Sequence, residues 1–455
     1  MAPDLKKPSS SVSILGMGYV GLCTAATFAS RGIRTIGIDI DEARIEQIRR
    51  GRAPVHEPQL GEMLKRVVKK KLLDATSDVS RATDTNTSFL TVGTPSQPDG
   101  SIDLTYVKQA TRELGKALQK KQSYHLVVVK STVIPGTTNG TVNPVLEQSS
   151  GKVVGPSLGL CANPEFLKEG TAINDALHPD KIVIGSNDKK SADQLTRLYR
   201  EFYGSRLPPV ITSSPETAEL VKYASNAFLA TKVSFINTIA NIAQHIPGVD
   251  VNRVAHAIGH DPRIGPLFLK AGPGYGGSCF HKDVQALVSY SQQQGYDPQL
   301  LKAIEKTNED QAIQVVELVE KLAGPLDQKR IAILGLAFKK DTDDIREAPS
   351  IRVIDRLRNK GARLVGYDPM AMPNFESVFG NTIELAKSSH DVLKGGDCAI
   401  VMTEWDEFRR LKAKDYIAQM RKPVLVDARR IYNPAEFREL KFAGIGFGSE
   451  PLGPG

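Results

Sequence analysis

The feature that most constrains the fold is a glycine-rich turn near the start of the chain. Gly16, Gly18 and Gly21 follow an apolar run at 13–15 and open a helical pattern of apolar residues over 22–29. Strand, turn and helix in this order predict the first β-α-β unit of a doubly wound sheet, with a dinucleotide pyrophosphate at the helix N-terminus. Such a glycine pattern alone is weak evidence, but here its context fits. We expect the cofactor to lie on Gly16, Gly18, Tyr19, Val20 and Gly21.

A carboxylate follows the second predicted strand, at 35–39. Asp39 stands where an acidic side chain accepts hydrogen bonds from the cofactor ribose, and it would repel a 2′-phosphate. The sequence therefore favours NAD over NADP. Arg44 lies nearby and could instead attract that phosphate, so we include both residues in the expected cofactor site.

Three regions follow one another along the chain. Apolar runs at 13–15, 35–39, 88–92, 126–130 and 182–185 alternate with helical patterns, which predicts parallel strands joined by crossover helices. Strand signals then stop, and a helical periodicity runs from 216 to 245 before Pro247. Strand patterns return at 330–335, 363–367, 398–402 and 424–427. We expect an α/β fold with two Rossmann-like parallel-sheet domains, 1–213 and 325–455, joined by an all-helical domain, 214–324, whose long helix braces them.

Composition excludes several classes of protein. The chain has 455 residues, 40% of them hydrophobic, and a net charge of +8 spread thinly over the sequence. These values are typical of a soluble globular protein and suit an anionic small substrate rather than a nucleic acid. No apolar run is long enough to span a bilayer, and residues 1–11 lack the apolar core of a signal peptide. We expect a cytoplasmic protein with no membrane or nucleic-acid partner.

Two short motifs follow predicted strands. Thr94 lies in Val-Gly-Thr-Pro after the strand at 88–92, and Thr132 lies in Lys-Ser-Thr after the strand at 126–130. Ligands bind at the carboxyl ends of strands in such sheets, so both threonines could contact the cofactor. Plain turns also carry Thr and Gly at these places, and both interpretations stay open.

One cysteine differs from the other three. Cys23, Cys161 and Cys398 lie in helix or strand patterns, as small buried hydrophobes do, and no pair has disulfide or zinc spacing. Cys279 instead ends the glycine-dense loop 271–279 and precedes Phe-His-Lys-Asp. Glycines let a substrate approach the backbone, and a nearby lysine favours the thiolate. Cys279 is therefore a candidate nucleophile, and Asp283 shares its face if a helix starts at the cysteine.

Pairs of polar residues repeat a spacing of four. Lys222 and Asn226 share one face of the long helix, although such a pair is commonly solvated surface. Glu165 and Glu169 could polarise water, or could cap a helix that begins at Pro164. A histidine pair at 256 and 260 lacks a third ligand, so we expect no metal site.

Together these segments resemble the UDP-glucose/GDP-mannose dehydrogenase family, and within it the UDP-glucose 6-dehydrogenases. The matching motifs occur in the family's order and cover nearly the whole chain: 16–21, 92–95, 163–170, 222–228, 274–283 and 335–346. His281 is a departure, because many members carry proline there.

The resemblance implies a four-electron oxidation of UDP-glucose to UDP-glucuronate with two NAD, through a thiohemiacetal and a thioester on Cys279. It implies that Lys222 and Asn226 stabilise oxyanions and that Asp283 activates water, supported by Thr132 and Glu165. Glu169 belongs to the same region and is included with the cofactor residues. The residues implied for substrate binding are Glu165, Phe166, Leu167, Lys222, Asn226, Arg263, Lys270, Tyr275, Gly276, Phe338, Lys339 and Arg429.

Other functions remain as alternatives. A GDP-mannose or UDP-N-acetyl-hexosamine dehydrogenase shares the same machinery. A 6-phosphogluconate or β-hydroxyacid dehydrogenase makes one hydride transfer and needs no thiol, and an NAD-responsive regulator needs no catalytic residues at all. The long helix and Arg263, which resembles an arginine that reaches a neighbouring subunit's substrate, imply a homodimer or a higher homo-oligomer.

Overall fold

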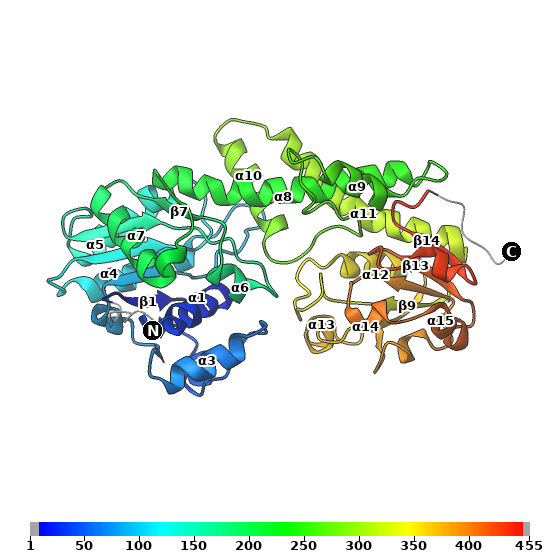
Figure 1. Ribbon diagram of the computed structural model, residues 1–455, viewed down its shortest axis with the longest axis horizontal. Coiled ribbons are helices and arrows are strands. Elements are labelled where there is room, and N and C mark those ends of the chain that lie inside the picture. Colours follow the sequence, from blue (N-terminus) through cyan, green and yellow to red (C-terminus); the bar gives the residue numbers. More distant parts are fainter. Residues whose placement is uncertain (1–8, 449–455) are drawn as a thin grey trace. The chain divides into compact units, whose positions relative to one another are not determined.

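The computed structural model describes residues 9–448 and divides into two compact units, Met1–Ala224 and Ser225–Gly455 (Figure 1). Each unit is described by itself below. Within 9–448 no helix combines the length and the hydropathy that spanning a bilayer requires. The expectation about a signal peptide concerns an N-terminus whose first eight residues lie outside the described range.

The first unit is built on an eight-stranded sheet in the order β3-β2-β1-β4-β5-β6-β7-β8. Its strands are β1 (Ser11–Leu15), β2 (Arg34–Ile38), β3 (Leu73–Thr76), β4 (Thr87–Leu90), β5 (His125–Val129), β6 (Leu158–Ala162), β7 (Ile182–Gly185) and β8 (Val210–Ser213). The first six strands follow the order of a dinucleotide-binding sheet, in which the chain reverses direction across the sheet between β1 and β4. Ligands bind at the carboxyl edge of that reversal point.

Helices cover both faces of this sheet. They are α1 (Tyr19–Ser30), α2 (Glu42–Arg49), α3 (Leu60–Lys69), α4 (Thr105–Leu118), α5 (Asn143–Ser150), α6 (Ala172–Leu177) and α7 (Lys189–Tyr203), with short turns η1 (Val79–Asp84), η2 (Thr138–Val142) and η3 (Gly204–Arg206). Successive side chains of a strand point to opposite faces. On β5, Leu126 and Val128 accordingly join a core with α1, α3 and α7, whereas Val127 and Val129 join one with α4 and α5.

The direction of one strand, β7, differs from the prediction. The segment 182–185 was expected in parallel pairing, but β7 pairs antiparallel to β6, with Ala162 opposite Gly185. A parallel neighbour would require the chain to cross back to the other end of the sheet. The connection 163–181 instead stays at the carboxyl edge, where α6 packs against α1. The antiparallel step thus leaves the Asn163–Gly170 motif at the edge where ligands bind.

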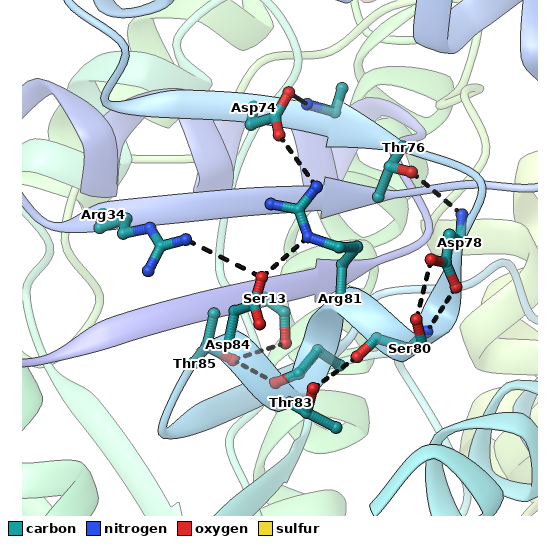
Figure 2. A network of polar contacts seen from close by, with 12 residues as sticks. Ser13, Arg34, Asp74, Thr76, Asp78, Ser80, Arg81, Thr83, Asp84 and Thr85 are labelled. Carbon is teal, nitrogen blue, oxygen red and sulfur yellow. Dashed lines mark hydrogen bonds and ion pairs between the residues drawn. The ribbon is translucent and has the colours of Figure 1, made fainter.

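Ion pairs join neighbouring elements near the amino ends of β2, β3 and β4, away from the carboxyl edge, as Figure 2 shows. Arg81 on η1 lies 3.6 Å from Asp74 at the start of β3 and 2.8 Å from Asp84, which is also 3.9 Å from Arg34. At the other end of η1, just after the carboxyl end of β3, Asp78 caps η1 by accepting the Ser80 N–H. These charges are largely solvent-exposed, so each pair adds little to stability. None of the residues expected at the active site belongs to these ion pairs.

The second unit begins within the long helix predicted over 216–245, which is α8 (Pro215–Ala243). Three more helices complete the helical region: α9 (Val251–Gly259), α10 (Phe280–Gln293) and α11 (Gln299–Ala323). The three-domain division expected from the sequence stays a prediction, because the compact units meet at 224–225, inside α8.

A second sheet follows, with the order β11-β10-β9-β12-β13-β14 and all pairings parallel. Its strands are β9 (Arg330–Leu334), β10 (Arg363–Tyr367), β11 (Glu384–Leu385), β12 (Cys398–Val401), β13 (Val424–Asp427) and β14 (Lys441–Gly444). The other elements are α12 (Pro349–Asn359), α13 (Met372–Phe379), α14 (Asp406–Arg409), α15 (Ala413–Gln419), η4 (Asp391–Leu393) and η5 (Pro434–Phe437). In relative order this is again the six-strand dinucleotide-binding arrangement, so the predicted fold class is confirmed.

Asp368 stabilises the turn after β9, at the point where the strand order of the second sheet reverses. It follows β10, is 1% exposed, and its Oδ2 accepts the N–H groups of Leu336 and Ala337 in the turn after β9. The same oxygen accepts the indole N–H of Trp405 at 3.0 Å. A buried carboxylate needs such donors, and here they come from the turn that the strand ends must form.

Replacing Asp368 by alanine should destabilise the second unit by roughly 3 kcal/mol, because buried N–H groups lose a charged acceptor. Asp368→Asn keeps one acceptor oxygen and should lose less. Trp405 is the single tryptophan of the chain and touches Asp368, so its fluorescence during urea unfolding reports this unit directly.

Asp355→Ala provides the control, because Asp355 is an exposed residue of α12. We expect its unfolding midpoint to match that of the unmodified chain. An Asp368→Ala midpoint equal to that of the control would contradict the proposed role of the carboxylate.

Candidate active site

The glycine turn after β1 has the geometry that its sequence predicts. Gly16 has φ +96°, a left-handed conformation that glycine adopts without strain, and its N–H donates to Ile38 O. A Cβ on Gly21 would lie 1.8 Å from Gly16 O, so α1 could not approach the turn with a larger residue there. Among the residues described, no side chain or backbone beyond the adjoining chain lies within 4 Å of a Cβ position on Gly18. This open backbone at the start of α1 (Tyr19–Ser30) fits a pyrophosphate.

Asp39 lies directly after β2, beside this turn. Its Oδ2 accepts the Met17 N–H at 2.6 Å and the guanidinium of Arg44 at 3.0 Å. Arg44 also lies 3.5 Å from Asp41. Two carboxylates therefore face one guanidinium, which leaves the ribose position net negative and suits NAD rather than a 2′-phosphate.

The two strand-end threonine motifs meet at the reversal point. Thr94 Oγ1 donates to Thr132 O at 2.9 Å, and Ser131 Oγ donates to Val92 O at 2.7 Å. The ends of β4 and β5 are thus tied together next to the glycine turn, since Thr91 Oγ1 also donates to Gly16 O. The sequence alone left these motifs as either plain turns or contacts; their joined position favours the second interpretation.

A buried ion pair occupies the carboxyl edge of β6. Glu165 Oε1 lies 3.0 Å from Lys222 Nζ, and both side chains are less than a tenth exposed. The alternative in which Glu165 and Glu169 cap a helix is wrong, because 163–170 forms a loop and α6 starts only at Ala172. The alternative of a solvated Lys222 is wrong too. The helix spacing was insufficient to decide this, because it does not tell which face is buried.

Electrostatics keep Glu165 ionised. Burial works to raise the pKa of Glu165, but the Lys222 ammonium and the Leu167 N–H outweigh it and hold that pKa below its ordinary value. Lys130, buried at the end of β5, adds to the effect and donates to Asn163 Oδ1 at 3.2 Å. Burial lowers the pKa of Lys130 to about 8, opposed by Glu165. A second buried lysine, with a lowered pKa, thus lies beside the pair.

Glu57 was missed by the sequence analysis. It is 5% exposed, and its carboxylate accepts the Tyr19 hydroxyl and, at 2.7 Å, the Gly170 N–H. It thereby joins the first residue of α1 to the loop that carries Glu169, a half-buried residue. No motif surrounds Glu57, so only the structure could identify this link. Phe166 also lies beside the Glu165–Lys222 pair, with the Lys222 ammonium 5.6 Å from its ring centre.

In the second unit Cys279 immediately precedes α10 (Phe280–Gln293), as expected, and is exposed, whereas the other three cysteines are buried. A thiol at a helix N-terminus has its thiolate form favoured. The Asp283 N–H donates to Cys279 O, which places Asp283 one turn along α10. Asp283 is 2% exposed and accepts from Asn226 Nδ2 and from Lys282 Nζ, both at 2.6 Å. Asn226 is therefore buried beside Asp283 and is not a surface residue.

The glycine loop 271–279 packs on the turn after β9. A Cβ on Gly277 would lie 2.8 Å from the Phe338 ring, and one on Gly276 would lie 2.3 Å from Glu347 O. Gly277 N–H also donates to Arg346 O at 2.9 Å. The loop that carries the thiol is thus fixed against the reversal point of the second sheet.

Arg429 and Glu404 lie at the carboxyl ends of β13 and β12. Arg429 Nη2 donates to Phe338 O at 2.6 Å and its Nε lies 3.5 Å from Glu404. Lys270 is 4.0 Å from Glu404, and burial lowers the pKa of Lys270. Lys339 lies beside Phe338, its ammonium 5.3 Å from the ring centre. Three cations and an aromatic ring therefore converge where a nucleoside diphosphate would bind in such a sheet.

Arg263 is not brought to these residues. Its exposed guanidinium binds Asp261, two positions earlier, with Nη2 at 2.6 Å from Oδ2. The described residues hold no group of three His, Cys, Asp or Glu side chains that could bind a metal.

Comparisons with known proteins place these observations in one family. Three models of the UDP-glucose/GDP-mannose dehydrogenase family match the chain: the NAD binding domain at 10–203, the central domain at 216–310 and the UDP binding domain at 332–434. The chain therefore belongs to the UDP-glucose/GDP-mannose dehydrogenase family, and is an NAD-dependent oxidoreductase.

Particular relatives agree over almost their full length. A UDP-glucose 6-dehydrogenase of Haloferax volcanii is 44% identical over 93% of this chain and 98% of its own. One from Bacillus subtilis is 37% identical over 94% of this chain and 90% of its own. A UDP-glucose dehydrogenase structure from Pyrobaculum islandicum has a TM-score of 0.91 at 38% identity, covering 98% of this chain and 100% of that one.

Lys222→Met should leave Glu165 buried without its main partner and lower the free energy of unfolding at pH 7 by roughly 3 kcal/mol. In the unmodified chain the pKa of Glu165 is depressed, so its contribution is present above the ordinary glutamate range and lost only as pH falls through the depressed pKa. In the variant, burial dominates and the pKa of Glu165 rises. The deficit should therefore be smaller at pH 5 than at pH 7, measured as urea midpoints by circular dichroism.

The double variant Lys222→Met/Glu165→Gln is the matched control and should recover much of the lost stability, because the carboxylate charge that Lys222→Met leaves unpaired is also removed. A Lys222→Met deficit that is equal at both pH values would show that Glu165 does not depend on Lys222.

Proposed function

We propose that this chain oxidises UDP-glucose to UDP-glucuronate with two NAD and one water. The observation that carries the proposal is Cys279, an exposed thiol at the start of α10, with Asp283 one turn later in the same helix. A single oxidation to an aldehyde needs no nucleophile, whereas oxidation through to a carboxylate becomes two easier steps if a thiol holds the carbonyl carbon. The names of the relatives above support UDP-glucose as the substrate.

The cofactor would be held by the turn 16–21, the ribose carboxylate Asp39 and the joined strand ends at Thr94 and Thr132. When bound, NAD supplies the acceptor for the hydrides that leave C6 of the sugar. The open backbone at Gly18 and the uncapped start of α1 are the groups that fit its pyrophosphate.

The residues of the chain divide the remaining work. Cys279 attacks the aldehyde carbon, forming a C–S bond while the carbonyl oxygen gains negative charge. Lys222, assisted by Asn226, stabilises this oxyanion. After the second oxidation C6 of the sugar is a thioester carbon, which water attacks. The C–S bond then breaks, which releases the carboxylate product and returns Cys279 as a thiolate. Asp283 positions that water, and Thr132 and Glu165 support it.

Substrate recognition is assigned to side chains at the two carboxyl edges. In the first unit these are Glu165, Phe166 and Leu167, with Glu169 in the same loop. In the second unit they are Lys270, Tyr275, Gly276, Phe338, Lys339 and Arg429. Arg429 suits a diphosphate because a guanidinium can offer it parallel hydrogen bonds.

Three domains would carry these roles: 1–213 for NAD, 214–324 for the thiol loop and self-association, and 325–455 for the UDP group. The extents of the three family matches support this division. The exposed guanidinium of Arg263 would bind substrate in a neighbouring copy of the chain, so the active form would be at least a dimer. The enzyme would act in the cytoplasm.

The unmodified chain should release two NADH per UDP-glucose consumed, measured by absorbance at limiting substrate. Cys279→Ser should lower the rate of UDP-glucuronate formation by roughly 10³-fold, because the second oxidation loses its covalent route. Cys398→Ala, which alters a buried thiol on β12, should keep the stoichiometry. One NADH per substrate together with an active Cys279→Ala variant would contradict the mechanism.

Substrate choice is tested by comparing UDP-glucose, GDP-mannose and UDP-N-acetylmannosamine side by side. We expect kcat/KM to be at least about tenfold higher for UDP-glucose, because polar groups built for one substrate are left unpaired by another. A higher kcat/KM for either competitor would reassign the substrate within the family.

A further inference from the structure

His281 lies two residues after Cys279, in the first turn of α10. Its Nδ1 forms an ion pair with the Glu305 carboxylate of α11, and its side chain is only 19% exposed. A cation at a helix N-terminus is unfavourable because it faces the positive end of the helix dipole. The position therefore gains stability only through an acidic partner such as Glu305.

Glu305 also holds the loop on the other side of the thiol. Its second oxygen accepts the Tyr275 hydroxyl at 2.5 Å. One turn further along α11, Asn308 accepts the Tyr275 N–H at 2.7 Å and donates to Tyr275 O at 3.1 Å. Tyr275 in turn packs edge-on against Phe280, with ring centres 5.7 Å apart. Residues before and after Cys279 are thus both fixed to Glu305 of α11, and Tyr275 is held by Asn308 as well.

Charged groups from three neighbouring segments act on the His281 imidazole. Glu305 on α11 raises the pKa of His281, burial opposes it, Glu347 raises it further and Arg352 of α12 lowers it, with a net rise. Its neighbours on α10 are Lys282 and Asp283, which form their own ion pair. The Tyr275 hydroxyl stays neutral, since burial and Glu305 raise its pKa.

We propose that His281 is a positioning residue for Cys279: its ion pair with Glu305 clamps the start of α10 to the helix that already holds Tyr275, and the clamp fixes the thiol-bearing loop between them. The imidazolium is the part of the clamp that can be switched off. Neutral His281 leaves the contacts of Tyr275 with Asn308 in place but releases the end of the loop, up to Cys279, together with the first turn of α10.

The direction of the pH effect follows from the raised pKa. A group whose folded-state pKa is raised gives stability that is fully present below the ordinary histidine pKa and is lost as pH rises through the raised value. The loop is therefore held most firmly at mildly acidic pH and loosens toward alkaline pH.

Amide hydrogen exchange of the peptide covering 272–280 tests the clamp without any substrate. At pH 6, His281→Gln should increase its exchange about fivefold after correction for intrinsic rates, and by a smaller factor at pH 8.5. His281→Pro should behave similarly, because it lacks the imidazole, and in a first helical turn the N–H that proline also removes has no helical partner. His256→Gln, at an exposed site on α9, is the control and should leave this peptide unchanged.

The partner is tested by a double-mutant cycle. Glu305→Gln alone should also loosen the peptide, and its combination with His281→Gln should add little more, because both remove one interaction. Equal exchange in the unmodified chain and both His281 variants at pH 6, or fully additive effects in the cycle, would overturn the clamp.

The catalytic consequence rests on the proposed function of Cys279. His281→Gln should lower kcat at pH 6 about three- to tenfold and leave KM for NAD unchanged, since a misplaced nucleophile weakens the reacting geometry and not cofactor binding. A loosened peptide with unchanged kcat would overturn the positioning role. A chain without turnover would count against the proposed function, while hydrogen exchange would still decide the clamp.

Discussion

Each of the two sheets depends on one carboxylate that lies directly after its second strand and binds the backbone of the turn after its first. Asp39 accepts the Met17 N–H in the first unit, and Asp368 accepts the Leu336 and Ala337 N–H groups in the second. A parallel sheet must open a crevice where its strand order reverses, and the backbone groups that line the crevice lose their strand partners there. The carboxylate supplies the missing acceptor and fixes the shape of the crevice before any ligand arrives.

The two carboxylates then serve different chemistry. Asp39 is also bound to Arg44 at the edge where a ribose would lie, so it can both shape the turn and contact the cofactor. Asp368 gives its remaining capacity to Met370, Ala371 and Trp405, and is a structural residue. In the proposed function, the ligand contacts of the second sheet would come instead from residues at the ends of β12 and β13. One arrangement of strands would therefore support two different nucleotide sites.

Much of this was predictable from the sequence because the signals are local. The turn at 16–21, the strand pattern, the long helix that became α8 and the exposed Cys279 each show within a short window. Short strands such as β3, β8 and β14 escaped prediction, since four residues of mixed polarity carry little periodicity. The strand at 182–185 was predicted as β7, but its antiparallel direction was not, because nothing in a strand's own sequence states the direction of its neighbour.

The partners of buried polar groups were the least predictable part of the site. Glu165 and Lys222, or His281 and Glu305, are far apart in the chain, and either could as well have faced water. A helical spacing of four relates two residues of one helix to each other but not to the protein core. Glu305, Asn308 and Gln311 gave a weak signal, as polar residues on the buried and mainly apolar face of α11.

The contrast between one exposed and three buried cysteines has a practical consequence. A thiol-reactive dye or cross-linker should modify this chain at a single position, next to the reacting centre, without removal of any native cysteine. The same accessibility makes that position the place where peroxide would first form a sulfenic acid, and the three remaining thiols, being buried, offer it no ready route to a protective disulfide.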